Sequence, residues 1–391
     1  MATRLKKWTP DLISELQIAF TGGRLVQDNI IIVHEALHHF KNHKRGRRRD
    51  MMLKLDMKKA YDMVDWDCLE ALLEKYGFED RWCKWVSTCI RSVKFSILFN
   101  GEATDLFTLS RGIRQGDPLS PFLFILMSNA LTFFIDKEVA QEHLKGIKLN
   151  SRCPTNTHCL FADDTFIFGK ANIQEARKIL DLISNYGAIT GQEVNINKSS
   201  IFFSANVPVD EKASIIAHLG FASLNCHSKY LGVPTEWGNS KKETFSFLIQ
   251  RMEKMGEAWK SLLLSHGGKE ILLKAVIQAI PSYIMYLFHL PVNLNKKMDY
   301  LLTNFFWSGS MQKSSLHWCR KEVLCAPKFE GGLGFRSFKD FNMALLAKQA
   351  WRLLSSPDSL WSCLLKGLYF SRGDFMNAKK GSRSSWIWAS L

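Results

Sequence analysis

The sequence of 391 residues has no long apolar run. Residues 1–7 are basic, but residues 8–16 contain a proline and two acids and cannot form the continuous apolar core of a secretory signal. The most apolar stretch, 275–292, is interrupted by polar residues and two prolines, so a packed segment suits it better than a membrane span. We therefore expect a soluble intracellular protein of the nucleus or cytoplasm, with no membrane partner.

The sequence also lacks the cysteine spacing of a disulfide framework. Its nine cysteines are scattered, and three of them, Cys68, Cys83 and Cys89, stand in apolar helical sequence where a free thiol packs as a small hydrophobe. This usage is typical of a reducing compartment. His317, Cys319 and Cys325 form an alternative zinc set, but no second pair with ligand spacing follows them.

Acidic residues are scarce relative to basic ones, with 37 Asp and Glu against 52 Lys and Arg, which leaves a net charge of +15. Such an excess attracts a polyanion such as nucleic acid. Six cations gather in residues 41–49. This run is a flexible basic loop that touches nucleic-acid phosphates, a nuclear import signal or a solvated loop. A hydrophobic content of 46% permits a sizeable core and two or three domains.

Two neighbouring aspartates, Asp163 and Asp164, separate the apolar β-prone runs 158–161 and 165–168. Successive side chains on a strand point to opposite faces, so adjacent carboxylates serve one site only where the chain turns, and we expect both at a hairpin tip. Adjacent like charges resist joint ionisation unless a cation neutralises them, which indicates a divalent metal. Because Asp-Asp is also a common turn dipeptide, a solvated loop is the alternative.

A third carboxylate, Asp56, favours the metal. Residues 52–56 are expected to form a short strand that ends on Asp56, and a helix with Asp65 as N-cap and Gly77 as its stop follows. A strand ending there can lie beside the hairpin and complete a cluster of three carboxylates. Such a cluster holds two Mg²⁺ ions about 4 Å apart and promotes phosphoryl transfer.

Between these carboxylates lies the block 111–121, which is suited to handling nucleotides. Its two glycines allow the backbone to approach a ligand, Arg111 and Arg114 can meet phosphates, and Gln115 can donate and accept at a nucleotide edge. The end of the block predicts the start of an apolar helix over 122–135, with a serine N-cap and a proline at the first helical position.

Two further local patterns are strong. Asn100-Gly101 predicts a hairpin turn after the β-prone run 94–99, and Asn172 with Glu175 predicts a capped helix that extends to Tyr186.

Three blocks in this order resemble palm motifs A, B and C of reverse transcriptases. They are LDMKKAYDMVDW at 55–66, RGIRQGDPLSPFLFILMSNAL at 111–131 and FADDTFIF at 161–168. In particular the chain resembles plant non-LTR retrotransposons of the LINE type, and further agreeing blocks lie at 21–40, 191–203, 230–234 and 331–354.

The resemblance implies roles for single residues. Asp56 and Asp163 would be the main metal ligands, with Asp164 beside them and two Mg²⁺ ions, or Mn²⁺, as the cofactor. Tyr61 falls where the family keeps an aromatic steric gate that excludes a ribose 2′-hydroxyl, although plain core packing is its alternative. Lys198, in the motif D position, would protonate the departing pyrophosphate or is a solvated lysine.

The motif B residues are implied to form the nucleotide pocket. Arg114, Gln115 and Gly116 would lie next to the template and the incoming nucleotide.

The fold class implied by the resemblance is α+β, a right-hand polymerase with fingers, palm and a helical thumb. Its expected parts are partial fingers with the basic loop at 1–50, the palm and fingers core at 51–205, the helical thumb at 206–306 and a Trp-rich segment at 307–391. In that last part, Trp307, Trp318, Trp351 and Trp361 either pack in a core or stack on bases.

The thumb is expected to contain two helices, 245–264 and 269–280, joined by Gly267-Gly268. Cations occur among the apolar residues of both helices, a pattern typical of a thumb that holds a duplex by its phosphate backbone. They are Arg251, Lys254, Lys260, Lys269 and Lys274.

The expected function is that of an RNA-directed DNA polymerase, which adds deoxynucleotides to a DNA primer on an RNA template. No endonuclease and no RNase H are recognisable, and we expect a fragment of a longer polyprotein. Two alternatives stay open: a retroelement-derived relic that binds nucleic acid without polymerising, and an RNA-dependent RNA polymerase.

Overall fold

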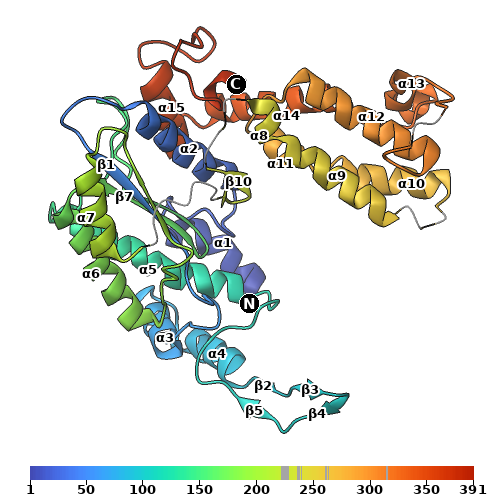
Figure 1. The fold of residues 1–391 in the computed structure, drawn as a ribbon. Helices are drawn as coiled ribbons and strands as arrows, with labels where there is room; N and C mark the ends of the chain where they lie inside the picture. The colour runs from blue at the N-terminus through green and yellow to red at the C-terminus, as the bar shows by residue number, and fades with distance from the viewer. Residues whose placement is uncertain (222–228, 236–237, 239, 260–261, 263, 314–315) are drawn as a thin grey trace. The chain divides into compact units, whose positions relative to one another are not determined.

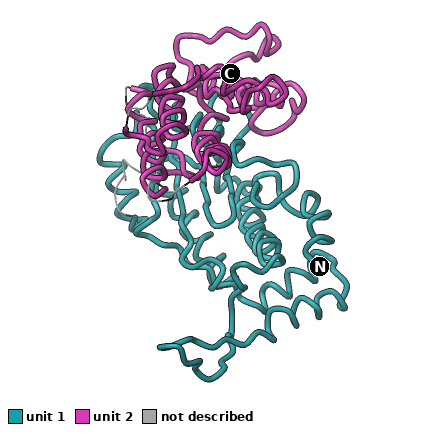
Figure 2. Tube along the Cα trace, turned by 90° about the vertical axis from the view of Figure 1, so that its right-hand side faces the viewer, with its two compact units in different colours: residues 1–225 teal, residues 226–391 magenta. Residues whose placement is uncertain are grey.

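The computed structural model describes residues 1–221, 229–235, 238, 240–259, 262, 264–313 and 316–391. The chain divides into two compact units, Met1–Asn225 and Cys226–Leu391, shown in teal and magenta in Figure 2. The first unit combines helices with a sheet, and the described part of the second is mostly helical. The predicted α+β class is therefore confirmed, whereas the predicted four-part division stays a prediction.

An antiparallel sheet of four strands, in the order β6-β7-β1-β8, forms the centre of the described first unit (Figure 1). The strands are β1 (Asp50–Leu55), β6 (His158–Phe161), β7 (Asp164–Lys170) and β8 (Ser200–Phe203). β1 lies inside the sheet, where both of its edges are paired, and every residue of it except Lys54 is buried. A strand covered on both faces needs an almost continuous apolar sequence, as Met-Met-Leu provides.

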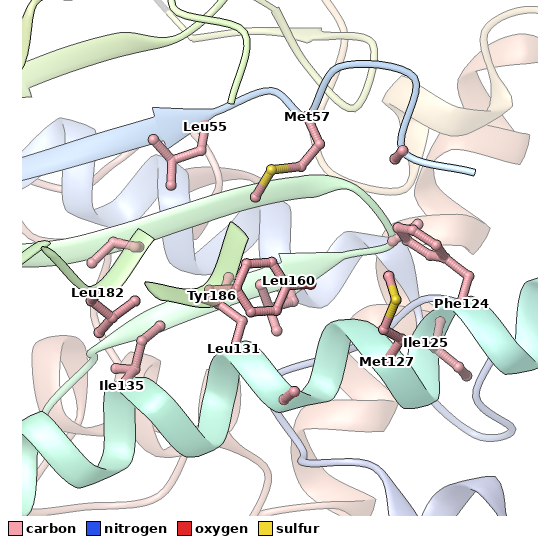
Figure 3. Packing of buried hydrophobic residues seen from close by; sticks show 14 of the residues in the cluster. Leu55, Met57, Phe124, Ile125, Met127, Leu131, Ile135, Leu160, Leu182 and Tyr186 are labelled. Carbon is pink, nitrogen blue, oxygen red and sulfur yellow. The ribbon is translucent and has the colours of Figure 1, made fainter. Parts of the chain in front are cut away.

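The main core of this unit lies between one face of the sheet and two helices, α5 (Ser120–Ala140) and α6 (Ile173–Thr190). Leu55 and Leu160 of the strands belong to one buried cluster with Leu131 and Ile135 of α5 and Tyr186 of α6 (Figure 3). α5 is apolar on nearly all sides, as expected of a helix buried in a core. α2 (Val26–Asn42) packs on β6, where the Asn29 amide donates to the Leu160 carbonyl at 2.9 Å.

Several predicted helix starts are confirmed. α3 (Trp66–Lys75) is capped by Asp65, whose carboxylate accepts from the Cys68 N–H at 2.8 Å, and α6 is capped by Asn172 but runs four residues past Tyr186. The predicted serine cap of α5 is wrong, because Ser120 is already helical. Leu119 holds the N-cap position without a side-chain bond. Asp117 fastens the preceding turn, with its carboxylate accepting from the Leu119 N–H at 2.8 Å and its carbonyl from the Ser120 N–H.

The predicted hairpin around Asn100-Gly101 is also confirmed, and it projects from the body of the unit (Figure 1). Asn100 and Gly101 both have positive φ, 51° and 90°, as a two-residue turn between right-twisted strands requires. Its strands are β2 (Lys94–Phe95), β3 (Leu98–Phe99), β4 (Glu102–Ala103) and β5 (Phe107–Thr108). The remaining helices described in this unit are α1 (Ala2–Leu12), α4 (Asp80–Arg91) and α7 (Val209–Leu219).

The second unit is built around α12 (Val292–Ser308), which packs on α9 (Ser246–Trp259), α10 (His266–Leu272) and α14 (Phe338–Ser355). α9 covers most of the first predicted thumb helix; residues 260–261 and 263 of that prediction, Lys260 included, lie outside the described residues. The predicted Gly267-Gly268 linker is wrong. Both glycines lie in the first turn of α10, because Ser265 caps this helix by accepting from the Gly268 N–H at 3.2 Å.

The smaller described elements of the second unit complete the chain. They are β9 (Lys229–Tyr230), β10 (Val233–Pro234), α8 (Lys241–Thr244), the π-helix η1 (Leu273–Ile277), α11 (Ser282–Met285), α13 (Lys321–Cys325), η2 (Lys328–Glu330), α15 (Leu360–Tyr369) and η3 (Trp388–Ser390). Of the four tryptophans considered from the sequence, Trp361 is buried, Trp307 is half-buried, and Trp318 and Trp351 are exposed. Among the residues described, no helix is both long and apolar enough to cross a bilayer.

Candidate active site

The β6–β7 hairpin presents Asp163 at its tip. The closing pair of the ladder is Phe161 with Asp164, so the turn consists of Ala162 and Asp163. Ala162 has a φ of 54°, unusual for a residue with a Cβ, and Asp163 is exposed. The prediction that both aspartates occupy the tip is therefore wrong for Asp164, which already belongs to β7 and is half-buried.

Asp56 lies beside this hairpin, at the end of the neighbouring strand. The β1–β7 ladder ends with Leu55 opposite Thr165, so Asp56 follows one residue beyond the strand, opposite Asp164. Residues directly opposite each other in a sheet project to the same side. The register therefore brings Asp56 and Asp164 to the same end of the sheet, with Asp163 at the adjoining turn.

The charge of Asp56 acts on both aspartates of the hairpin. Desolvation raises the pKa of Asp163 and the negative charge of Asp56 adds to the rise, while a backbone hydrogen bond and the charge of Lys198 lower it. Burial likewise raises the pKa of Asp164, and the charges of Asp163 and Asp56 add to that rise while Lys54 opposes it. Carboxylates that raise one another's pKa favour a cation nearby.

Carboxylate oxygens are the ligands that Mg²⁺ and Mn²⁺ prefer, so the donor set at this end of the sheet suits a divalent metal. No group of three or more His, Cys, Asp or Glu side chains converges closely enough to hold an ion within the described ranges. Asp56, Asp163 and Asp164 thus form an open cluster, consistent with the mutual repulsion of like charges. The same finding covers His317, Cys319 and Cys325, which lie in the described part and do not converge on a zinc site.

Lys198 is held near the carboxylates by the backbone of Asp56. The Asp56 carbonyl accepts from the Asn195 N–H at 2.7 Å, and the Asp56 N–H donates to the Ser199 hydroxyl at 3.2 Å. These bonds fasten the turn 195–199, in which Lys198 is exposed, to the end of β1. A positive charge is thereby placed within electrostatic reach of Asp163.

The ring of Tyr61 stacks on Phe124 of α5, with centroids 4.9 Å apart and an interplanar angle of 12°. Burial raises the pKa of Tyr61, and so does the charge of Asp163. The Tyr61 carbonyl accepts from the Ile113 N–H at 2.9 Å. Tyr61 therefore connects motif B to the carboxylates and remains half-buried rather than part of the closed core.

Two of the predicted motif B residues line a cleft that does not include the three aspartates. Arg114 and Gln115 border a space of about 600 Å³ that also involves Trp66 and Phe95, and Arg114 forms an ion pair with Asp117 at 3.5 Å. Gly116 is exposed with a φ of 91° and has open space around it. Arg114 and Gln115 thus lie at a cleft that residues of α3 and α4 also line.

A second cleft, of about 450 Å³, opens beside Asp56 itself. Three cations besides Lys198 line it: Lys58, Lys59 and Arg111. Lys58 forms an ion pair with Glu193 at 3.3 Å, and Arg111 also borders the larger cleft described above. Positive charge therefore lines this cleft beside the Asp56 carboxylate, and the negative charge of a phosphate chain bound there would neutralise these cations.

Sequence reasoning missed Gln17, which supports the aspartate turn from a distant segment. Its side chain is fully buried, and its Oε1 accepts from the Ala162 N–H at 3.1 Å and from the Ala19 N–H at 3.1 Å. Its Nε2 donates to the Ser128 hydroxyl of α5 at 3.0 Å. Because a single glutamine in an irregular segment has no periodicity or motif spacing, the sequence carried no signal for this role.

Comparison with known proteins finds a match to a family model. The family model described as reverse transcriptase (RNA-dependent DNA polymerase) matches residues 1–251. The chain is 24% identical over 382 residues to an uncharacterized 149 kDa protein of transposon TX1 from Xenopus laevis, covering 94% of this chain and 27% of that protein. It is 29% identical over 201 residues to a retrovirus-related Pol polyprotein from a type-2 retrotransposable element of Drosophila melanogaster, covering 51% and 17%.

Among solved structures, the chain is similar to apo telomerase from Candida tropicalis, with a TM-score of 0.43, 12% identity, and coverage of 93% of this chain and 60% of that one. The chain spans about a quarter or less of the length of the two retroelement proteins that it matches.

Proposed function

The chain belongs to the reverse transcriptase family, and on that basis we propose that its first unit adds deoxynucleotides to a DNA primer along an RNA template. The observation that carries the proposal is the end of the sheet that bears Asp56, Asp163 and Asp164, with Lys198 and Tyr61 nearby. Phosphoryl transfer of this kind needs positioning and charge stabilisation more than covalent chemistry from the protein.

The three carboxylates would hold Mg²⁺ or Mn²⁺, which when bound lowers the pKa of the primer hydroxyl and offsets charge on the triphosphate. The chain's own groups supply the rest. Lys58, Lys59 and Arg111 attract the triphosphate into the cleft beside Asp56, and Arg114, Gln115 and Gly116 act on the template side of the motif B loop. Lys198 donates a proton to the departing pyrophosphate from its turn next to Asp163.

Tyr61 selects the sugar. Its ring is held in place by stacking on Phe124, so it cannot readily move aside for a ribose 2′-hydroxyl. Base pairing reads the template, and the protein contacts are therefore expected to be largely independent of sequence.

The test is Mg²⁺-dependent primer extension on an RNA template, with deoxynucleotides and ribonucleotides supplied separately. We expect extension with deoxynucleotides, and a loss of about a hundredfold or more in Asp163→Asn. Asp181→Asn is the matched control, because it removes an exposed carboxylate from α6 and should leave extension unchanged.

The alternatives predict other outcomes. Tight template binding without any extension would overturn the polymerase and leave a nucleic-acid-binding relic. Equal use of ribonucleotides would overturn the role of Tyr61, and exclusive use of them would indicate an RNA-dependent RNA polymerase.

A further inference from the structure

A cleft of about 580 Å³ lies at the opposite end of β1 from the carboxylates. Five cations from three separate segments line it: Arg47, Arg48, Arg49, Lys145 and Lys170. β1 begins at Asp50, next to this cleft, and ends just before Asp56. Six residues of strand at about 3.3 Å each separate the two places by about 20 Å. We call the site the rear cleft.

The loop that contributes the arginines is tied to the sheet, in contrast to the flexible loop considered from the sequence. Asp50 is fully buried and pairs with Arg48 at 3.2 Å and with the Lys170 ammonium at 2.6 Å. Arg49 forms an ion pair with Glu211 of α7, and its carbonyl accepts from the Ala171 N–H at 3.0 Å. The Asn206 amide donates to the Arg48 carbonyl at 2.7 Å. These contacts arrange the positive charges before any ligand arrives.

Charge remains after the internal pairs are counted. Asp50, Glu175 and Glu211 offset three of the five cations, which leaves an excess of two positive charges. The first residues of α6, a helix of 18 residues, also border the cleft and add the positive end of its dipole. Arg47 takes no part in these interactions. Lys145 forms no ion pair among those described above, although its charge lowers the pKa of the nearby Glu175 carboxyl against the effect of burial.

We infer that the rear cleft is a second nucleic-acid site, which holds the phosphate backbone of a single strand outside the polymerising site. The identity of the ligand as a nucleic-acid strand rests on the proposed function. The site's chemistry requires only phosphodiester groups, which guanidinium and ammonium donors bind without reading the sequence. A template that extends about 20 Å beyond the carboxylates is long enough to reach it.

The test is the binding of a labelled single-stranded RNA to the full chain over a series of salt concentrations. Arg47→Gln/Lys145→Gln should weaken binding about tenfold at low salt and reduce the slope of log affinity against log salt by about 1.4, since each phosphate contact on a single strand contributes about 0.7. Arg47→Lys/Lys145→Arg should retain the affinity and the slope. Thermal unfolding monitored by circular dichroism establishes that both variants fold.

Lys75→Gln/Lys84→Gln is the matched control, because it removes the same charge from exposed positions of α3 and α4. Equal losses in this control would overturn the inference, and so would an unchanged slope in Arg47→Gln/Lys145→Gln. If that variant lost polyglutamate binding as much as RNA binding, the cleft would select negative charge alone and the nucleic-acid assignment would fall.

Primer extension separates this inference from the proposed function. With a short template, Arg47→Gln/Lys145→Gln should extend the primer at the wild-type kcat. A lower kcat would mean that the rear cleft takes part in polymerisation itself, and it would overturn the inference of a second site. If the wild type fails to extend the primer, while Arg47→Gln/Lys145→Gln binds RNA more weakly than the wild type, the polymerase proposal is overturned and the rear cleft remains a nucleic-acid site.

Discussion

Single residues in the candidate active site are positioned by partners far away in the sequence. Ala162, at the turn that carries Asp163, has a positive φ, and its N–H is held by Gln17 from 145 residues away. The same glutamine binds Ser128 of α5 through its other polar atom. A fully buried amide that satisfies two backbone donors and one hydroxyl leaves the turn few alternative conformations, so Gln17 is a positioning residue for Asp163.

Replacing Gln17 by leucine tests this role. Gln17→Leu leaves the buried Ala162 N–H without its acceptor, which costs about 1–3 kcal/mol of stability. We expect kcat for primer extension to fall about tenfold or more while KM for the template changes little, because the turn and not the binding surface is altered.

Gln349→Leu is the control, since Gln349 is equally buried but belongs to the second unit. It should lower the free energy of unfolding without lowering kcat. An unchanged kcat in Gln17→Leu would refute the positioning role.

Among the elements, the motif B loop depends on one close backbone approach. The Gly112 N–H donates to the Val64 carbonyl at 2.8 Å, and the neighbouring Ile113 N–H donates to Tyr61. Gly112 has a φ of 94°, and a Cβ placed there would lie 2.8 Å from the Asp62 carbonyl oxygen. Glycine at 112 therefore allows the loop to lie directly against the segment that carries Tyr61.

Gly112→Ala and Gly116→Ala form a matched pair. Both glycines have φ near 90°, so alanine costs about 1–2 kcal/mol of backbone strain at either position. Only Gly112→Ala adds the contact with Asp62, which we expect to cost about 1–3 kcal/mol more. Urea unfolding measures the two free energies, and equal values would mean that the loop relaxes away from Asp62.

At the scale of the whole molecule, the two units differ in how acid should affect them. Burial lowers the pKa of three histidines in the first unit, to about 3 for His34 and His158 and to about 4 for His39. Among the described residues of the second unit, burial lowers the pKa of His289, and the positive charges of Lys241 and Lys339 add to the effect. Two units with separate cores are expected to unfold in separate transitions.

The stability of the first unit should fall as the pH drops below about 6.5. A histidine with a depressed pKa in the folded state stays neutral there but gains a proton when unfolded, so its stabilisation is complete above the unfolded pKa of about 6.5 and is lost toward the folded pKa. Each group contributes up to about 1.4 kcal/mol per pH unit in this window. The raised pKa values of Asp163 and Asp164 act in the opposite direction and reduce the slope.

Denaturant unfolding at pH 7 and pH 5 measures this effect, and His158→Gln should reduce the pH dependence of the first unit. His218→Gln is the control, because His218 is exposed on α7. Identical pH dependence in the wild type and His158→Gln would contradict the prediction.

The sequence by itself determined the local elements whose signals are short in range. Asp65 and Asn172 cap their helices because a side-chain oxygen reaches an N–H three residues away, and Asn100-Gly101 turns because both residues tolerate positive φ. It also identified the family, since motifs A, B and C are each contiguous. The cap of α5 was missed by one residue, because Leu119 precedes the helix and Ser120 already takes the first helical position.

The tertiary structure alone decided how these pieces meet. The register of β1 on β7 brings Asp56 opposite Asp164, and the ladder's closing pair separates Asp163 at the turn from Asp164 in the strand. Gln17 on the aspartate turn, and Arg47 with Lys145 in one cleft, are neighbours only because distant segments pack on the same sheet. Such contacts depend on strand pairing and packing over a hundred residues, which a local pattern of side chains does not encode.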